Sequence, residues 1–252
     1  MTAPAPAMVP LAPAAEAVCL LEAHLRRTLP PGARILPREP LARRTTLRVG
    51  GPADLLVEPA NEQELSLLLH AARAFAVPWR VIGRGSNLLV RDSGVRGLVI
   101  CLSSPAFAQV EVNAPLLRCG AGVRLKDLAA TARRHGLAGL EFLAGIPGSV
   151  GGALRMNAGA WNSMTFDRVD SVRFLTPDGE VREARGPDIP TAYRRCDLLR
   201  DHIAVAATVR GDPSTPEQVE ARLNELNSKR WASQPAAPSA GCIFKNPAAL
   251  PA

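Results

Sequence analysis

The sequence predicts an α+β fold made of more than one unit. Segments with apolar residues at helical spacing are flanked by short apolar segments that are typical of strands. Two strand-like segments around Pro177-Asp178-Gly179 have the pattern of a β-hairpin. The chain has 252 residues, enough for one large domain or two to three small ones, so a sizeable hydrophobic core is possible.

The first predicted unit combines two helices with three strands. Apolar residues at helical spacing, ended by Pro30-Pro31, predict a helix over residues 16–28. Asn61 followed by Glu64 has the pattern of a capping box and predicts the start of a second helix, which ends before Pro78. Strands are expected at residues 54–58, 79–82 and 98–102.

The second predicted unit is richer in strands. A helix over residues 124–135 is expected to end at Gly136, because glycine commonly follows a helix C-terminus. Residues 139–161 are dense in Gly and Ala and show neither the helical nor the strand period, so we expect a structureless functional segment there. Strands are expected at residues 108–113, 116–119, 170–175, 180–184 and 203–210.

A third unit is expected to begin with a helix that runs to about Trp231. Thr215, Pro216 and Gln218 have the pattern of an N-cap, a proline at the first helical position and a capping-box partner. Because this helix would have no partner against which to bury an apolar face, we expect the chain to be a fragment or a protein whose last domain is missing. The expected boundaries are a leader at residues 1–15, two subdomains at 16–103 and 104–211, and an incomplete last domain at 212–252.

Composition and charge exclude several classes of protein. Apolar residues make up 47% and charged residues 21%, which excludes a disordered chain, a collagen and a coiled coil. The net charge is +7, but the arginines are dispersed and aromatic residues are only 4%. Nucleic-acid binding is therefore disfavoured, and binding of an anionic small molecule is favoured. No apolar run is long enough to span a membrane.

The cysteines and the N-terminus indicate the cellular compartment. The five cysteines are odd in number and no two are closer than 18 residues, which argues against a disulfide framework and against a CxxC metal site. Residues 1–13 alternate Ala with Pro and lack the basic and apolar regions of a signal peptide. We therefore expect reduced thiols in the cytoplasm, a disordered leader and no metal site.

Two glycine-rich loops suggest a pyrophosphate site. Gly83-Arg84-Gly85-Ser86-Asn87 follows an apolar strand, and such a loop lets backbone N–H groups and a Ser hydroxyl approach a phosphate. Residues 146–153 contain three glycines among small residues. Taken singly, the first loop is compatible with a plain strand connection and the second with tight backbone packing. Two such loops on neighbouring units favour a dinucleotide held between them.

Six motifs together resemble the UDP-N-acetylenolpyruvoylglucosamine reductase family. The resemblance covers about residues 41–248 and follows the order of motifs in that family. The motifs lie at residues 45–53, Gly83–Val90, 139–153, Met156–Ala160, Tyr193-Arg194 and 239–247.

The resemblance implies a fold, a cofactor and a reaction. The fold is a two-subdomain FAD-binding module of the vanillyl-alcohol-oxidase type, followed by a substrate-binding domain that is truncated here. In this family, NADPH reduces FAD, and the flavin passes a hydride to the enolpyruvyl ether of a UDP-sugar, a step of peptidoglycan synthesis. Apart from the resemblance, we expect a monomer that binds neither nucleic acid nor a membrane.

The resemblance assigns roles to five residues outside the glycine loops. Arg194 would stabilise the enolate and Cys242 would donate the proton, a role that Ser usually has in the family. Tyr193, Lys245 and Asn246 would contact the substrate. Each side chain also has a plain structural interpretation: a solvated arginine or lysine, a half-buried aromatic residue, or a small buried thiol.

The expected cofactor contacts centre on the two loops. The pyrophosphate is expected on the amides of the first loop, and the isoalloxazine ring near Gly159 and Ala160. The full set is Gly83, Arg84, Gly85, Ser86, Asn87, Leu88, Gly120, Ala121, Ile146, Pro147, Gly148, Ser149, Gly151, Gly152, Ala153, Asn157, Gly159, Ala160 and Val205.

The sequence also departs from the family pattern. Trp161 stands where Tyr is common, Ser233 stands where Lys is frequent, and no residue matches the family's late catalytic Glu. We therefore expect impaired turnover by this chain. A non-catalytic FAD-binding remnant, or another flavoprotein with the same module, remains an alternative.

Overall fold

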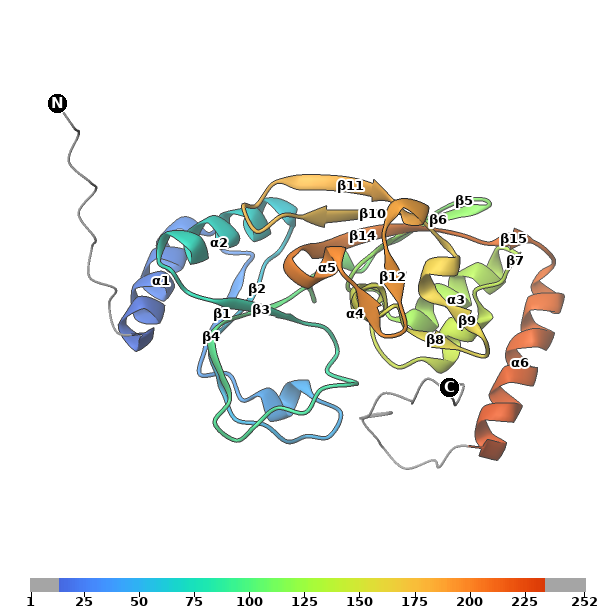
Figure 1. Ribbon diagram of the computed structural model, residues 1–252, viewed down its shortest axis with the longest axis horizontal. Helices are drawn as coiled ribbons and strands as arrows, with labels where there is room; N and C mark the ends of the chain where they lie inside the picture. The colour runs from blue at the N-terminus through green and yellow to red at the C-terminus, as the bar shows by residue number, and fades with distance from the viewer. Residues whose placement is uncertain (1–13, 234–252) are drawn as a thin grey trace.

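The computed structural model describes residues 14–233 and arranges them in two α+β units that lie side by side (Figure 1). The expected leader and the chain beyond residue 233, with Cys242, Lys245 and Asn246, lie outside the described residues. The predicted fold class is confirmed. The domain boundaries expected from the sequence stay a prediction.

The first unit is a four-stranded sheet with the strand order β1-β2-β4-β3. Strand β1 is antiparallel to β2, whereas β2, β4 and β3 run parallel. The strands are β1 (Arg34–Pro37), β2 (Ala53–Glu58), β3 (Trp79–Ile82) and β4 (Val95–Cys101), and the helices are α1 (Ala14–Thr28) and α2 (Glu62–Ala74). Strand β4 begins three residues before the predicted start, because Val95 already pairs with Ala53 of β2.

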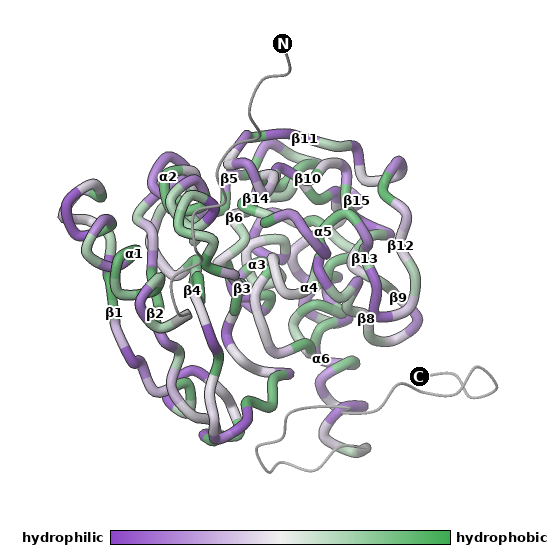
Figure 2. The backbone as a smooth tube through the Cα atoms, turned by 60° about the vertical axis from the view of Figure 1, so that its left-hand side comes forward, coloured by the Kyte–Doolittle hydropathy of each residue, from purple (hydrophilic) through white to green (hydrophobic). Residues whose placement is uncertain are grey.

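The central strands β2 and β4 are buried on both faces, as is usual for parallel strands, whereas the edge strands β1 and β3 are partly exposed. Leucines of α1 and α2 pack on one face, against Leu55 and Val57 of β2 and Leu98 of β4. Leu41 covers the opposite face, against Leu56 and its neighbours. Hydrophobic and hydrophilic residues alternate along α2, which is visible in Figure 2. The continuous apolar runs of β2 and β4 are therefore explained by burial on two sides.

Helix α2 begins as the sequence predicts. Asn61 is the N-cap, and its side chain accepts a hydrogen bond of 2.9 Å from the Glu64 N–H group. The Glu64 carboxylate accepts a bond of 2.7 Å in return, but from the N–H group of Ala60 rather than that of Asn61. The capping box is thus present with its second bond shifted by one residue.

The second unit is a five-stranded antiparallel sheet with the order β11-β10-β14-β6-β5. Its strands are β5 (Val110–Asn113), β6 (Leu116–Gly120), β10 (Val169–Leu175), β11 (Val181–Arg185) and β14 (Ile203–Arg210). Its helices are α3 (Leu125–Arg134), α4 (Val150–Met156), α5 (Leu198–Asp201) and α6 (Pro216–Ser233).

Short elements connect these strands and helices. The short strands are β7 (Leu137–Ala138), β8 (Gly159–Ala160), β9 (Ser163–Met164), β12 (Thr191–Ala192), β13 (Arg195–Cys196) and β15 (Asp212–Pro213). The 3₁₀ turns are η1 (Leu41–Arg44), η2 (Pro105–Phe107), η3 (Glu141–Gly145), η4 (Thr165–Asp167) and η5 (Gly186–Asp188).

The expectation of a structureless segment at residues 139–161 is wrong. The segment contains η3, the seven-residue helix α4 and strand β8. Val150, Ala153 and Leu154 form a buried stripe at helical spacing, but the glycines between them hide that period in the sequence. Gly151 serves packing, because a side chain there would lie only 3.0 Å from the Ala121 Cβ atom, whereas Gly152 has no such close contact.

The expectation that the last helix lacks a partner is also wrong. Helix α6 packs on η3, α3 and β7 of the second unit. It buries Val219, Leu223 and Leu226, and Glu220 forms an ion pair with Arg133 of α3. The Thr215 hydroxyl caps the helix by accepting a bond of 3.3 Å from the Gln218 N–H group. The Gln218 side chain, however, accepts from Ser214 instead of completing a capping box.

An apolar core and a polar contact join the two units. Leu175, Ile203 and Val205 of the second unit belong to the hydrophobic cluster that α1 and α2 form with the first sheet. The Arg173 guanidinium of β10 contacts both carboxylate oxygens of Glu62 on α2, at 3.0 and 2.8 Å. The relative position of the two units is therefore fixed by packing and by charge.

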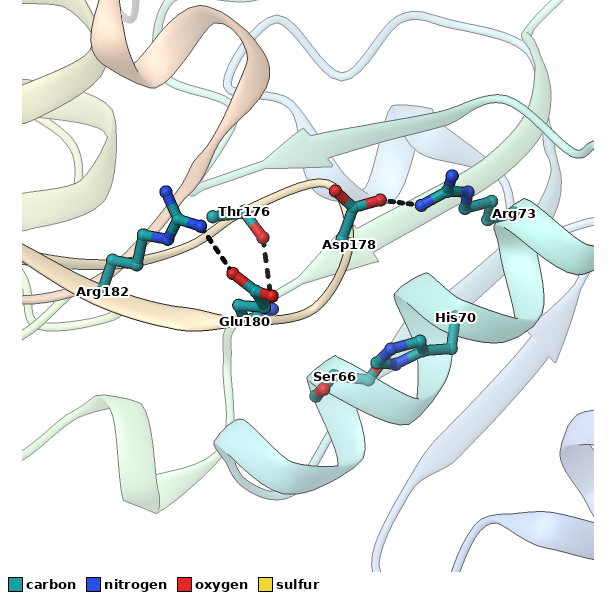
Figure 3. Close-up of polar contacts among 7 residues, drawn as sticks. All are labelled: Ser66, His70, Arg73, Thr176, Asp178, Glu180 and Arg182. Atoms are coloured by element: carbon teal, nitrogen blue, oxygen red, sulfur yellow. Dashed lines mark hydrogen bonds and ion pairs between the residues drawn. The ribbon is translucent and has the colours of Figure 1, made fainter.

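The turn between β10 and β11 lies directly against α2 (Figure 3). The Ser66 hydroxyl donates a hydrogen bond of 2.7 Å to the Gly179 carbonyl, and Arg73 forms an ion pair with Asp178. Gly179 has a φ of +77°, in the left-handed region that favours glycine. An added Cβ atom would lie 2.7 Å from both the His70 ring and the Ser66 hydroxyl.

We expect the substitution Gly179→Ala to destabilise the protein by at least about 1–2 kcal/mol, the usual cost of the left-handed conformation alone. Displacement of Ser66 and His70 adds to this cost. Urea unfolding followed by circular dichroism measures the change. The control is Val181→Ala, at an exposed position two residues along, which should change stability by less than about 0.5 kcal/mol. An unchanged unfolding midpoint for Gly179→Ala would show that this turn does not need the close contact.

Candidate functional site

The first glycine loop leaves the sheet at the carboxyl ends of parallel strands. Residues 83–87 follow β3 directly, and β3 pairs with β4 up to Ile82 and Cys101. In open sheets of this kind, ligands bind outside the carboxyl ends of the strands. The loop therefore starts at the edge of the sheet where a ligand is expected.

The backbone of this loop rests on the chain that follows η1. The Thr46 N–H group donates a hydrogen bond of 3.1 Å to the Gly85 carbonyl. A Cβ atom on Gly85, whose φ is +64°, would lie 1.9 Å from the Arg44 carbonyl oxygen. Only glycine permits this approach.

The second glycine loop lies against the first. The Ser86 hydroxyl donates a hydrogen bond of 2.9 Å to the Pro147 carbonyl. A Cβ atom on Gly83 would lie 2.9 Å from the Ser149 hydroxyl, and one on Gly148 would lie 3.3 Å from the Ser86 hydroxyl. The fold thus brings together the two loops that the sequence singles out, one from each unit.

The amides of the two loops differ in what they bind. Val150 and Gly151, at the start of α4, donate to the carbonyls of Val123 and Ala121 at 2.9 and 2.8 Å. The N–H groups of residues 85–87 donate to no acceptor within residues 14–233. The first loop therefore has three successive free donors for an anion, beside the exposed Arg84, whereas in the second loop the Gly148 and Ser149 N–H groups have no acceptor among residues 14–233.

Three further expected cofactor residues lie at the strands beside α4. The Ala121 N–H group donates to the Val205 carbonyl at 2.8 Å, which joins β6 to β14 next to the start of α4. Gly120 and Val205 also line a cavity of about 420 Å³ near the N-terminus of α2, together with Arg118. Ala121 thus stands close to the glycine loops through its contact with Gly151, whereas this cavity extends toward α2.

Asn157, Gly159 and Ala160 lie at the opposite end of α4 from the second loop. A helix of seven residues is about 10 Å long, so these residues are separated from Ser149 by about that distance. The Asn157 side chain is buried and accepts a hydrogen bond of 3.1 Å from the Phe166 N–H group. Asn157 therefore has a structural partner, and its contact with a flavin remains a prediction.

Tyr193 and Arg194 form the two-residue turn between β12 and β13. Arg194 is half-buried, has a φ of +55°, and lies with its guanidinium 5.5 Å from the centre of the Tyr193 ring. A left-handed arginine is uncommon, and such residues cluster at functional sites. Strand β13 packs against α4, where Cys196 is fully buried. The turn is thus held beside the helix that begins at the second glycine loop.

Arg194 and its neighbour Arg195 have different environments. The Arg195 guanidinium contacts the Asp197 carboxylate at 2.6 Å, and this hydrogen bond lowers the pKa of Asp197. Arg195 is therefore committed to a surface ion pair. Arg194, by comparison, is half-buried and lies over the Tyr193 ring.

Sequence reasoning missed an ion-pair network beneath the first loop. Arg44 contacts Glu39 at 2.9 Å and Glu58 at 2.6 Å, and Arg34 approaches the second oxygen of Glu58 at 2.7 Å. Burial lowers the pKa of Arg44, but its hydrogen bonds with Glu58 and Glu39 outweigh burial and leave that pKa raised. Arg44 and Glu58 are too far apart in the sequence for helix or hairpin spacing to reveal the pair.

Within the described part of the chain, no group of three His, Cys, Asp or Glu side chains could hold a metal ion. No helix among residues 14–233 has the length and apolar character needed to cross a membrane. Cys19 is exposed, whereas Cys101, Cys119 and Cys196 are buried free thiols. Burial raises the pKa of Cys119 to about 12, so that thiol stays protonated near neutral pH.

We expect Gly85→Ala to abolish flavin binding while the protein remains folded. The methyl group would overlap the Arg44 carbonyl, so the loop would have to leave its position at the sheet edge. Flavin absorbance per purified chain, with circular dichroism as the test of folding, measures the effect. The matched control is Gly32→Ala, because Gly32 is exposed, distant in sequence from both loops and has no positive φ. A Gly85→Ala variant with wild-type flavin content would show that this contact does not position the cofactor.

The family model described as FAD binding domain matches residues 53–185. A UDP-N-acetylenolpyruvoylglucosamine reductase from Pelobacter propionicus is 43% identical over 216 residues, which cover 85% of this chain and 72% of the relative.

Solved structures agree with this result. The reductase of the same name from Thermus caldophilus matches with a TM-score of 0.75 and 35% identity, over 87% of this chain and 77% of that one. A 4-ethylphenol oxidase from Gulosibacter chungangensis matches with a TM-score of 0.59 at 15% identity, over 79% and 43%. The last likeness concerns the fold alone.

Proposed function

The chain belongs to the UDP-N-acetylenolpyruvoylglucosamine reductase family of FAD-dependent oxidoreductases, and we propose that it reduces UDP-N-acetylenolpyruvoylglucosamine to UDP-N-acetylmuramate with NADPH as the electron donor. The observation that carries the proposal is the meeting of the two glycine loops, which would hold the cofactor of this reaction between the two units.

The residues of the two loops fit FAD. The first loop offers unpaired N–H groups to a pyrophosphate, and a side chain at Gly83 or Gly148 would meet the hydroxyl of Ser149 or Ser86 on the facing loop. Residues at the far end of α4, including Gly159 and Ala160, would lie beside the isoalloxazine ring. The other cofactor residues expected from the sequence are proposed on the same basis.

When bound, FAD would supply hydride transfer from NADPH to the methylene carbon of the enolpyruvyl ether. Negative charge would then develop on the neighbouring carbon and on its carboxylate. Arg194 suits the stabilisation of that charge, because a guanidinium stays protonated and can bind a carboxylate through two N–H groups. Its left-handed turn, packed beside α4, would hold it in a fixed direction without reorganisation.

Residues outside the described part of the chain complete the proposed site. Cys242 would donate the proton to the carbon next to the carboxylate, since a thiol is a stronger acid than the Ser hydroxyl usual in this family. Asn246 and Lys245 would hydrogen-bond the substrate, as would Tyr193. The product is a peptidoglycan precursor, and we propose that the reaction takes place in the cytoplasm and supports cell shape and division.

Cys242→Ala tests the proton transfer separately from flavin reduction. In anaerobic stopped-flow experiments, NADPH should bleach the flavin of this variant at the wild-type rate, because no proton from Cys242 is needed in that step. Reoxidation of the reduced flavin by the UDP-sugar should be slower than in the wild type by about 10²–10⁴-fold, the usual contribution of general acid catalysis. Cys242→Ser should recover much of the rate.

The control for this experiment is Cys19→Ala, which removes an exposed thiol on α1 and should leave both half-reactions unchanged. Equal reoxidation rates for Cys242→Ala and the wild type would remove Cys242 from the mechanism. A wild-type protein that binds FAD but is bleached by NADPH no faster than free FAD would contradict the proposed function itself.

A further inference from the structure

Residues 41–51 form a closed loop on the lower side of the first unit, which we call the arginine loop. The Leu41 and Ala42 N–H groups donate to the carbonyls of Gly51 and Gly50, both at 3.2 Å. The Gly51 N–H group donates in turn to the Arg91 carbonyl at 2.9 Å. In Figure 1 this loop is the blue segment with a short helical turn below β1 and β2. Its ends are thus fixed to each other and to the neighbouring chain.

The three arginines of this loop are used differently. Arg44 is neutralised by Glu39 and Glu58. Arg43 and Arg48 are exposed and have no carboxylate partner within the described residues. Both line a cavity of about 430 Å³, together with Ala42 and Thr45. Two guanidinium groups on one cavity, without a protein counter-charge, favour a ligand with a doubly charged anionic group.

The backbone holds Arg48 in an unfavourable conformation. Its φ is +54°, in the left-handed region where a long side chain is uncommon. Thr45 maintains this turn, because its carbonyl accepts a bond of 3.2 Å from the Arg48 N–H group and its hydroxyl donates a bond of 3.0 Å to the Val49 carbonyl. Thr45 itself is buried. Strain of this kind persists where the surrounding structure enforces it, and it is concentrated at ligand sites.

The arginine loop is also the support of the first glycine loop. Thr46 donates to the Gly85 carbonyl, and the Arg44 carbonyl lies beneath Gly85. A group bound by Arg43 and Arg48 would therefore lie next to the first glycine loop, on the side where the arginine loop contacts it. Because the proposed function assigns the pyrophosphate of FAD to the amides of residues 85–87, a phosphate bound by Arg43 and Arg48 would belong to a second molecule.

We propose that Arg43 and Arg48 bind a phosphate group of one of the two nucleotide reactants when it approaches the flavin. This inference rests on the proposed function, which supplies two molecules with that chemistry: NADPH and the UDP-sugar. Both present phosphate oxygens that a guanidinium can bind through two N–H groups. The two arginines would hold the reactant in a fixed position beside the proposed FAD site.

The double variant Arg43→Ala, Arg48→Gly tests the site, with Gly chosen because it accepts the left-handed backbone at position 48 without strain. Dissociation constants of NADP⁺, NAD⁺ and UDP are measured on the FAD-loaded protein from changes in flavin absorbance. We expect about tenfold to hundredfold weaker binding of at least one ligand, the usual loss when hydrogen bonds to a charged group are removed. Using Arg48→Lys in place of Arg48→Gly in this double variant should recover part of the lost ligand affinity.

The pattern of losses identifies the phosphate that is bound. Weaker binding of NADP⁺ but not of NAD⁺ assigns the site to the 2′-phosphate, weaker binding of both assigns it to the pyrophosphate of the dinucleotide, and weaker binding of UDP assigns it to the substrate. Arg27→Ala is the control, because it removes an exposed arginine on α1 that has no ion-pair partner among residues 14–233.

Two results would overturn the site. The first is a double variant that binds all three ligands as tightly as the Arg27→Ala control does. The second is loss of FAD from the double variant, which would make both arginines part of the FAD site. Failure of the proposed function looks different, because NADPH would then not bleach the flavin even in the wild-type protein.

Discussion

The contact between the backbones of Gly85 and Arg44 determines where the cofactor loop stands. The Arg44 carbonyl lies where a side chain on Gly85 would begin, and Thr46 donates to the Gly85 carbonyl from the same segment. The first glycine loop is therefore more than a connection after β3, because its backbone packs against the arginine loop. The Gly85 carbonyl and Cα atom are placed against this support, and the N–H groups of residues 85–87 have no acceptor among residues 14–233, which leaves them available to a ligand.

The support depends in turn on a charge pair. Glu58 ends β2, is almost fully buried and faces Arg44, which also binds Glu39. A buried carboxylate without a partner is costly, so the pair fixes the end of η1 to the sheet rather than adding much net stability. The sheet thus holds the charge pair, the charge pair fixes the arginine loop, and the arginine loop supports the first glycine loop. On the other side, α2 and the turn at Gly179 fix the second unit, which carries the second glycine loop.

The elements that were predictable from the sequence are those whose apolar pattern reports burial directly. Strands β3 and β14 have the predicted bounds, since their runs lie between clear turn residues. Helix α4 was missed because close packing at Gly151 uses small residues, which carry no periodic signal. The partner of α6 was missed because tertiary packing, not local pattern, supplies it.

The features of the candidate site likewise divide into those that could be predicted from the sequence and those that could not. The glycine loops could be found from short motifs, because each depends on a local backbone conformation, whereas Arg194 was found from the family resemblance and its left-handed turn was not predicted. The pairing of Arg44 with Glu58 and the cavity beside Arg48 could not, since both arise from segments that only the fold brings together. The strain at Arg48 likewise has no sequence signal, because arginine is an ordinary surface residue.

A crystal structure of the chain with FAD tests the central claim most directly. The account predicts that pyrophosphate oxygens lie within about 3 Å of the N–H groups of residues 85–87, with the ring system toward the far end of α4. Pyrophosphate bound elsewhere, for example in the cavity beside Arg118 at the start of α2, would show that the two glycine loops meet for packing and not for the cofactor.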